Sequence, residues 1–247
     1  GAAVGDPQVN QQLNAIQIER ALPSDLYERV VAMLTTESQK PENAQTRIAL
    51  AALLLMGDCG LRISEVASAQ AEKLEPSPFV VGQFRLTILG KGKKFRAVPL
   101  SERAHKAVQA HQQDLLNQYG ERPAKGAALI RPLSLPLIGK TSELHLSDWI
   151  GYAPNSIARL IKKTLKRISG LDEINVDDML KLRMTSAHGL RHTFGTMATE
   201  REMPLDVIQS ILGHASIDTT SIYIRAPEKR VAKEAEKYYA LVPLLKN

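Results

Sequence analysis

The sequence is poor in cysteine, because Cys59 is the single one among 247 residues. One cysteine cannot close an intramolecular disulfide and offers no thiolate cluster for zinc. A disulfide-stapled scaffold and a cysteine-rich metal module are therefore excluded, and a reducing compartment is favoured. We expect Cys59 to be a small buried hydrophobic residue.

Long apolar runs are also lacking. No window approaches the roughly 18 uninterrupted apolar residues of a membrane span. Residues 1–20 lack the charged, apolar and small-residue regions of a signal peptide. We therefore expect a cytoplasmic, nucleoid-associated protein without a membrane partner.

Acidic residues are outnumbered by basic ones. The chain has 26 Asp and Glu against 32 Lys and Arg, which gives a formal net charge of +6 and a pI near 9.4. This balance favours a polyanionic partner, nucleic acid before an anionic membrane. With 44% hydrophobic residues, the chain can bury a sizeable core in one large domain or two small ones.

The pattern of apolar residues predicts a mainly α fold with a small antiparallel β-sheet, of the α+β class. Residues 84–89 and 95–100 predict a β-hairpin with the basic tip Gly90-Lys-Gly-Lys-Lys94. Residues 1–20 are expected to be a flexible lead-in, and residues 121–153 and 171–185 irregular connections. Helical spacing and end signals predict helices at 25–34, 46–56, 64–71, 102–119, about 156–168, 187–201, 204–212, from Ser216 onward and 228–239.

One predicted helix is strongly basic on one side. Asn155 or Ser156 is expected to cap it, and its apolar face is formed by Ile157, Leu160, Ile161, Leu165 and Ile168. The opposite face carries Arg159, Lys162, Lys163, Lys166 and Arg167. This face is either an ordinary solvated surface or a surface that binds DNA phosphates.

Cations and possible nucleophiles gather in the C-terminal third. His188 and Arg191 are three positions apart, so in a helix they share a face, as two donors to one phosphate would. Gly213 is expected to end a helix and leave His214 at a turn, with Tyr223 nine positions further. Cleaving a phosphodiester without a metal requires a nucleophile, cations and an acid, and these residue types supply all three.

Four separated segments together resemble the tyrosine recombinase, or phage integrase, family. They are Gly60-Leu-Arg-Ile-Ser-Glu65, Gly90–Lys94, His188-Gly-Leu-Arg-His-Thr-Phe-Gly-Thr196, and Leu212-Gly-His214 with Tyr223. The resemblance covers roughly residues 21–245 and implies the family's catalytic-domain fold over residues 21–247. The family's N-terminal DNA-clasping domain is expected to be absent from this chain.

The resemblance also implies a role for each matching residue. Arg62 and Arg191 would clamp the scissile phosphate, and His214 would add a hydrogen bond to it. His188 would accept the proton of Tyr223, which would attack the phosphorus and form a 3′-phosphotyrosine. Three further roles belong to the hairpin and the helix after Arg62: Lys91 would protonate the leaving 5′ oxygen, Lys93 and Lys94 would contact DNA, and Glu65 would orient the arginines.

The implied reaction needs no metal and no nucleotide, so no cofactor is expected. The implied partner is double-stranded DNA, bound by four subunits on two duplexes, with a monomer in the absence of DNA. The segment from Glu228 onward would pack on a neighbouring subunit, unless Leu241–Leu245 fold back on their own domain.

Several alternatives stay open. Lys91 is one of several charges near the hairpin tip, beside Lys93, Lys94 and Arg96, and a neighbouring lysine could replace it as the acid. His188 and His192 could bind zinc, although the Glu of a metalloprotease motif is missing. At the level of function, the alternatives are a type IB topoisomerase, an inactive DNA-binding protein and, least favoured, a metal-dependent nuclease.

Overall fold

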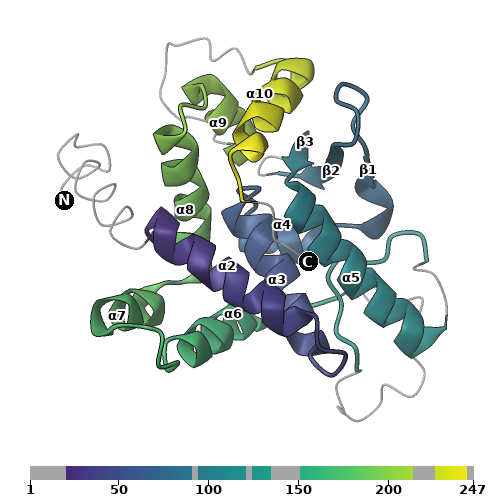
Figure 1. Cartoon of the computed structure of the whole chain (residues 1–247). Coiled ribbons are helices and arrows are strands. Elements are labelled where there is room, and N and C mark those ends of the chain that lie inside the picture. Colours follow the sequence, from purple (N-terminus) through teal and green to yellow (C-terminus); the bar gives the residue numbers. More distant parts are fainter. Residues whose placement is uncertain (1–20, 91–93, 121–123, 135–150, 214–225, 244–247) are drawn as a thin grey trace, which may run out of the picture.

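The computed structural model describes residues 21–90, 94–120, 124–134, 151–213 and 226–243. Its centre is helix α3 (Ala44–Gly57), which is buried from Ile48 to Gly57. Figure 1 shows α3 surrounded by other helices, and it contacts α2, α5, α6 and α8. Such all-round burial is what a helix that is hydrophobic on every side requires. The predicted central helix at 46–56 is confirmed.

The remaining elements of the described chain follow in sequence order. They are α2 (Ser24–Ser38), α4 (Ile63–Ser68), the 3₁₀ helix η1 (Ala71–Lys73), β1 (Leu74–Pro76), β2 (Phe84–Leu89), β3 (Phe95–Leu100), α5 (Glu102–Tyr119), α6 (Pro154–Ile168), α7 (Val176–Met184), α8 (Ala187–Glu200), α9 (Leu205–Leu212) and α10 (Glu228–Ala240). The mainly helical class with a small antiparallel sheet is confirmed.

The sheet has three antiparallel strands in the order β1-β2-β3. The predicted hairpin is confirmed with its expected bounds, and Leu89 pairs with Phe95 at the base of the tip. The short strand β1, which the sequence did not predict, pairs Leu74 with Leu86. Figure 1 shows the sheet at one side of the helices, close to α10.

Helix ends follow ordinary capping chemistry at several of the predicted positions. Ser101 accepts a hydrogen bond from the Ala104 amide at the start of α5, and Gly120 ends that helix in the left-handed conformation. Gly213 ends α9 in the same way. The start of α6 differs from the prediction, because its cap is Ala153 and Pro154 occupies the first helical position.

Two predictions about chain segments were wrong. Residues 171–185 are not irregular throughout, because they contain α7, whose cap Asn175 accepts from the Asp178 amide. The predicted helix at 64–71 ends at Ser68, because the backbone after it bonds elsewhere. The Ala69 carbonyl accepts from the Leu129 amide at 2.7 Å, and the Ala71 amide donates to the Ala127 carbonyl at 2.9 Å.

A buried polar network fixes the chain directly after α3. Both carboxylate oxygens of Asp58, which is 1% exposed, accept hydrogen bonds. The donors are the hydroxyls of Tyr27 and Ser101 and the guanidinium of Arg103. Because a buried carboxylate is stable only when it is fully paired, the loop that follows Asp58 is held in one position. Next to it, burial raises the pKa of the Cys59 thiol to about 12, in line with its expected role as a buried hydrophobic residue.

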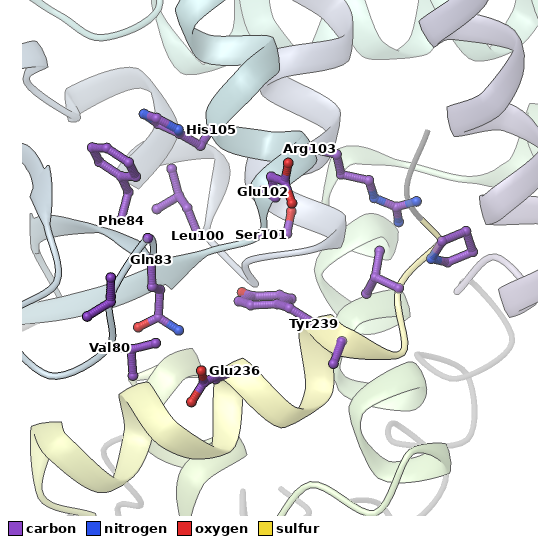
Figure 2. A pocket seen from close by; sticks show the side chains of 15 residues that line it. Val80, Gln83, Phe84, Leu100, Ser101, Glu102, Arg103, His105, Glu236 and Tyr239 are labelled. Carbon is purple, nitrogen blue, oxygen red and sulfur yellow. The ribbon is translucent and has the colours of Figure 1, made fainter. Parts of the chain in front are cut away.

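A cavity of about 330 Å³ lies between α10, the first turn of α5 and the sheet. Figure 2 shows Tyr239 of α10 on one side of it and the stacked rings of Phe84 and His105 on the other. Val242 lines this cavity and is buried against its own domain, so the chain folds back at this point. Leu244 and Leu245, the rest of that predicted segment, lie outside the described residues.

Candidate active site

The loop between α3 and α4 presents Arg62 at the N-cap of α4. Gly60 takes a positive φ of 70° at the bend, a conformation that favours glycine. The Arg62 amide donates to Glu65 Oε2 at 2.8 Å, and the Arg62 guanidinium donates to Oε1 at 2.9 Å. Arg62 also donates to the carbonyl of Gly213 at 3.3 Å, which ties this loop to the end of α9.

The Glu65 side chain is only 4% exposed and lies among cations. Arg96 donates to both of its carboxylate oxygens, at 2.8 and 2.9 Å. Burial alone would raise the pKa of Glu65, but the hydrogen bonds from Arg96 and from the Arg62 backbone, with the charges of both residues, lower it overall. Glu65 is therefore an ionised carboxylate at neutral pH.

Arg191 enters the same cluster from α8. Its guanidinium donates to the backbone carbonyls of Gly60 and Leu212 and lies 3.9 Å from Glu65 Oε2. Burial, followed by the charge of Arg62, lowers the pKa of Arg191 to about 9. It remains cationic at neutral pH, but its charge is incompletely neutralised by its neighbours.

His188 lies in the first turn of α8, one turn before Arg191. It is exposed, and its ring meets the ring of His192 edge to face at a centroid distance of 4.6 Å. Desolvation and then the charges of Arg191 and Arg62 lower the pKa of His188. The imidazole is therefore neutral at physiological pH, in the protonation state of a base.

Arg96 on β3 was not predicted to belong to the site. The sequence showed it only as one of several basic residues near the hairpin tip. The structure places it beside Glu65, while its Nε donates to the carbonyl of Ile211 at 2.9 Å. A motif that continued from the glycine-rich tip into β3 would have included Arg96 among the predicted site residues.

The described cluster is electrostatically unbalanced. It contains the three guanidinium groups of Arg62, Arg96 and Arg191 and the one carboxylate of Glu65, which accepts from the first two. Within the described part of the chain, the cluster therefore carries a net charge of about +2. Such a site stabilises an anion, since an excess of buried positive charge is unfavourable until a counter-charge neutralises it.

Four predicted site residues, Lys91, Lys93, His214 and Tyr223, lie outside the described residues. The flanking residues are described. Gly213 ends α9, and the Ala226 amide donates to the hydroxyl of Ser210 on the same helix at 3.1 Å. The described chain therefore resumes beside α9 at Ala226. Lys94, the described lysine of the hairpin tip, is exposed.

The basic side of α6 is exposed as predicted. Its apolar residues Ile157, Ile161, Leu165 and Ile168 are buried, and Arg159, Lys162, Lys163 and Lys166 are exposed. Among the ion pairs found in the described chain, none involves these four residues. Arg167 differs, because it makes two hydrogen bonds to Glu37 of α2.

Substituting Gly60 by alanine is expected to destabilise the fold and dismantle the cluster. A Cβ at this position would lie 2.7 Å from the Phe194 ring, and the backbone there is in the left-handed region. We expect a loss of about 2–4 kcal/mol in the free energy of unfolding, measured in urea. Gly82→Ala is the matched control, since Gly82 has a φ of +79° but open space around it. Equal losses in the two variants would contradict the packing argument.

Two kinds of feature are absent from the described residues. No group of three or more His, Cys, Asp or Glu side chains is arranged to hold a metal ion among them. The same residues include no helix with the length and hydropathy of a membrane span.

Comparison with known proteins gives a consistent result. The sequence profile of the phage integrase family matches residues 22–230. A tyrosine recombinase of Pseudothermotoga lettingae is 27% identical over 231 residues, which are 94% of this chain and 64% of that protein. The tyrosine recombinase XerD of Rhizobium meliloti is 28% identical and is matched over 95% of this chain and 67% of its own length. The chain thus spans about two thirds of these relatives, and slightly less of the first.

Solved structures with the same fold include a XerH site-specific recombinase bound to a palindromic difH substrate. It superposes with a TM-score of 0.55 at 15% identity, over 90% of this chain and 50% of that one. XerA recombinase superposes with a TM-score of 0.50 at 17% identity, over 89% of this chain and 62% of that one. At these identities the likeness establishes the fold.

Proposed function

This chain belongs to the phage integrase family, and on that premise we propose that it is the catalytic part of a site-specific DNA recombinase. The observation that carries the proposal is the cluster of Arg62, Arg191 and Arg96 around one buried carboxylate. The cluster has an excess of positive charge, and Arg62 is its more accessible member, with 28% of its side chain exposed. A scissile phosphate is the anion that fits this arrangement in a DNA-cleaving enzyme.

In the proposed reaction, Arg62 and Arg191 neutralise the non-bridging oxygens of the phosphate as charge develops on them. His188 lies in the turn of α8 that leads to Arg191, and its lowered pKa keeps it neutral. A neutral imidazole at this position accepts the proton of the attacking hydroxyl. His214 adds a further hydrogen bond to the phosphate.

Tyr223 is the proposed nucleophile. It is three residues from Ala226, whose amide is bonded to α9, and three residues span at most about 10 Å. The distance between Tyr223 and α9 is therefore limited by the chain. The end of α9 is part of the arginine cluster, because the Leu212 and Gly213 carbonyls accept hydrogen bonds from Arg191 and Arg62. Attack on phosphorus forms the 3′-phosphotyrosyl bond and breaks the bond to the 5′ oxygen, which Lys91 or a neighbouring lysine protonates to a hydroxyl as it leaves.

The phosphotyrosyl bond keeps the free energy of the broken phosphodiester, so rejoining requires no nucleotide cofactor. We propose that rejoining to a partner strand takes place in a tetramer on two duplexes, and that the chain is monomeric without DNA. The XerH structure is described as bound to a palindromic difH substrate, and a Tn1549 transposon integrase that superposes with a TM-score of 0.51 is described as a complex with a circular intermediate DNA, which supports DNA as the partner. Light scattering that finds a stable tetramer without DNA would contradict the assembly scheme.

The test is covalent capture of DNA. Random-sequence duplexes, each carrying a nick that lets a cut fragment diffuse away, are incubated with the protein in EDTA, and DNA that stays bound on a denaturing gel is amplified and reselected. We expect a covalent adduct at a preferred sequence. Plasmids that carry this sequence then distinguish strand exchange between circles from relaxation of one circle. DNA binding without any adduct would contradict the proposal and identify a DNA-binding protein.

The exposed face of α6 is proposed to bind DNA phosphates. Replacing Lys162 or Lys166 by alanine is expected to weaken DNA binding uniformly across sequences and to lower the slope of log Kd against log salt by about 1. Arg167→Ala is the matched control on the same helix, since Arg167 is already paired with Glu37. Fluorescence anisotropy at four or more salt concentrations measures the slopes. Unchanged slopes in both lysine variants would identify a solvated face.

A further inference from the structure

Arg96 differs from Arg62 in how its hydrogen-bond donors are used. Its Nε donates to the Ile211 carbonyl, and its two Nη atoms donate to the two oxygens of Glu65. Its side chain is 8% exposed, whereas 28% of the Arg62 side chain is exposed. Arg96 therefore makes its hydrogen bonds inside the protein, while Arg62 remains accessible to a ligand.

Each oxygen of the Glu65 carboxylate accepts one hydrogen bond from Arg62 and one from Arg96. Oε1 accepts from the guanidiniums of Arg62 and Arg96, and Oε2 accepts from the Arg62 amide and from Arg96. A carboxylate that accepts two hydrogen bonds from one planar guanidinium, in a bidentate pair, cannot rotate without breaking both. The orientation in which Glu65 receives the Arg62 guanidinium is therefore set by Arg96.

Arg96 also lies between the starts of two segments that carry proposed catalytic residues. A Cβ on Gly90 would lie 2.9 Å from Arg96 Nη1, and a Cβ on Gly213 would lie 2.8 Å from its guanidinium carbon. Gly90 directly precedes Lys91, and Gly213 directly precedes His214. The guanidinium thus contacts the backbone at the start of each segment, and glycine leaves room for it at both.

We propose that Arg96 is a positioning residue of the reaction: through Glu65 it fixes the phosphate-binding guanidinium of Arg62, and it holds the start of the hairpin tip against the end of α9. The proposal rests on the recombinase function for its kinetic consequence. Its structural consequence, the immobilisation of Arg62, is independent of any reaction. Arg96 itself touches no substrate.

The kinetic test compares single-turnover rates of adduct formation on the captured DNA. Arg96→Lys keeps the positive charge but cannot donate two parallel hydrogen bonds to the Glu65 carboxylate. We expect the rate at saturating protein to fall about 10- to 100-fold, as for other residues that orient a reacting group. The Kd for DNA should stay within about twofold. Arg85→Lys is the matched control, because Arg85 on the adjacent strand β2 also binds carboxylates, those of Glu75 and Glu228. Its rate should equal that of the wild type, and melting temperatures verify folding.

A pH profile separates positioning from loss of structure. The charged groups around Glu65 are Arg62 from the loop before α4, Arg96 from β3 and Arg191 from α8. Arg96→Gln removes the largest contribution that keeps the pKa of this buried carboxyl low. The rate should then fall more steeply below pH 7 than in the wild type. His188 titrates in both proteins, so the difference between the two pH profiles measures the protonation of Glu65.

A spectroscopic measurement needs no DNA. In protein labelled with ¹⁵N-arginine, we expect slow rotation of the Arg62 guanidinium in the wild type, because its Nη atoms donate to Glu65 and to the Gly213 carbonyl. We expect faster exchange of the Nη resonances in Arg96→Gln and unchanged exchange in Arg85→Gln. Unchanged Arg62 rotation, or equal rates and pH profiles in all variants, would overturn the proposal. If the wild type forms no adduct, the recombinase function fails while the rotation still decides the role of Arg96.

Discussion

Tyr223→Phe is expected to eliminate the covalent protein–DNA adduct, with a loss of at least about 10⁴-fold in the rate of cleavage. Phenylalanine keeps the ring but lacks the oxygen that forms the bond to phosphorus. The phosphate-binding groups remain, because Arg62 and Arg191 are held by Glu65 and by the carbonyls of Gly60, Leu212 and Gly213. The measurement is the fraction of nicked duplex that becomes covalently attached in EDTA.

Affinity for intact duplex is the control for this substitution. The Kd should change less than about fivefold, since one hydroxyl contributes about 1 kcal/mol or less to binding when water replaces it. Tyr152→Phe is a suitable second control, because Tyr152 is a partly buried tyrosine of the described chain that packs on the core. An adduct that persists in Tyr223→Phe and disappears in another tyrosine variant would assign the nucleophile elsewhere.

Arg191→Lys is expected to reduce the rate of cleavage about 10²- to 10³-fold, the effect of removing one preorganised donor to a developing charge. The two Nη atoms of the Arg191 guanidinium donate to two different carbonyls, and a single ammonium cannot replace both of these bonds and also bind a phosphate. Loss of the positive charge at this position is expected to lower the rate of cleavage further. The surroundings lower the pKa of Arg191 to about 9, and a lysine, which starts from a lower pKa, would lose its proton near neutrality in the same place.

The pH dependence of the Arg191→Lys variant provides the specific test. An ammonium group that has lost its proton at pH 8 regains its charge as the pH falls, so the ratio of variant to wild-type rate should rise from pH 8 to pH 6.5. Loss of structure would give the same ratio at both values. A constant ratio with an unchanged melting temperature would show that geometry alone accounts for the defect.

Most helices were predictable because burial in this chain follows the hydrophobic pattern. The apolar face of α6 is buried and its basic face is exposed. Helix α7 was missed because it reverses this rule: Val176, Leu180 and Met184 are exposed, while Asp178 is buried and ion-paired with Arg29 of α2. A local pattern cannot reveal an ion pair to a residue 149 positions away. The end of α4 was missed for the same reason, since its backbone bonds to residues 127–129.

The candidate site was predictable where a motif lies in one short segment. The three-residue spacing of His188 and Arg191 and the pairing of Arg62 with Glu65 are both visible in the sequence, and the structure brings Arg191 to Glu65. Arg96 was not predictable, because its partners Glu65 and Ile211 are far from it in the chain and one of them is a backbone carbonyl. The roles of Lys91, His214 and Tyr223 stay predictions from the sequence.

The hydrogen bonds that assemble the arginine cluster have a consequence during synthesis. Arg191 binds a carbonyl 131 positions earlier in the chain, and Arg62 binds one 151 positions later. A nascent chain on the ribosome that has not passed Gly213 lacks one wall of the phosphate site, however well its first helices have formed. Under the proposed function, a half-made molecule cannot cut DNA, because cleavage becomes available only to a chain that has been translated past α9 to Tyr223 and has folded.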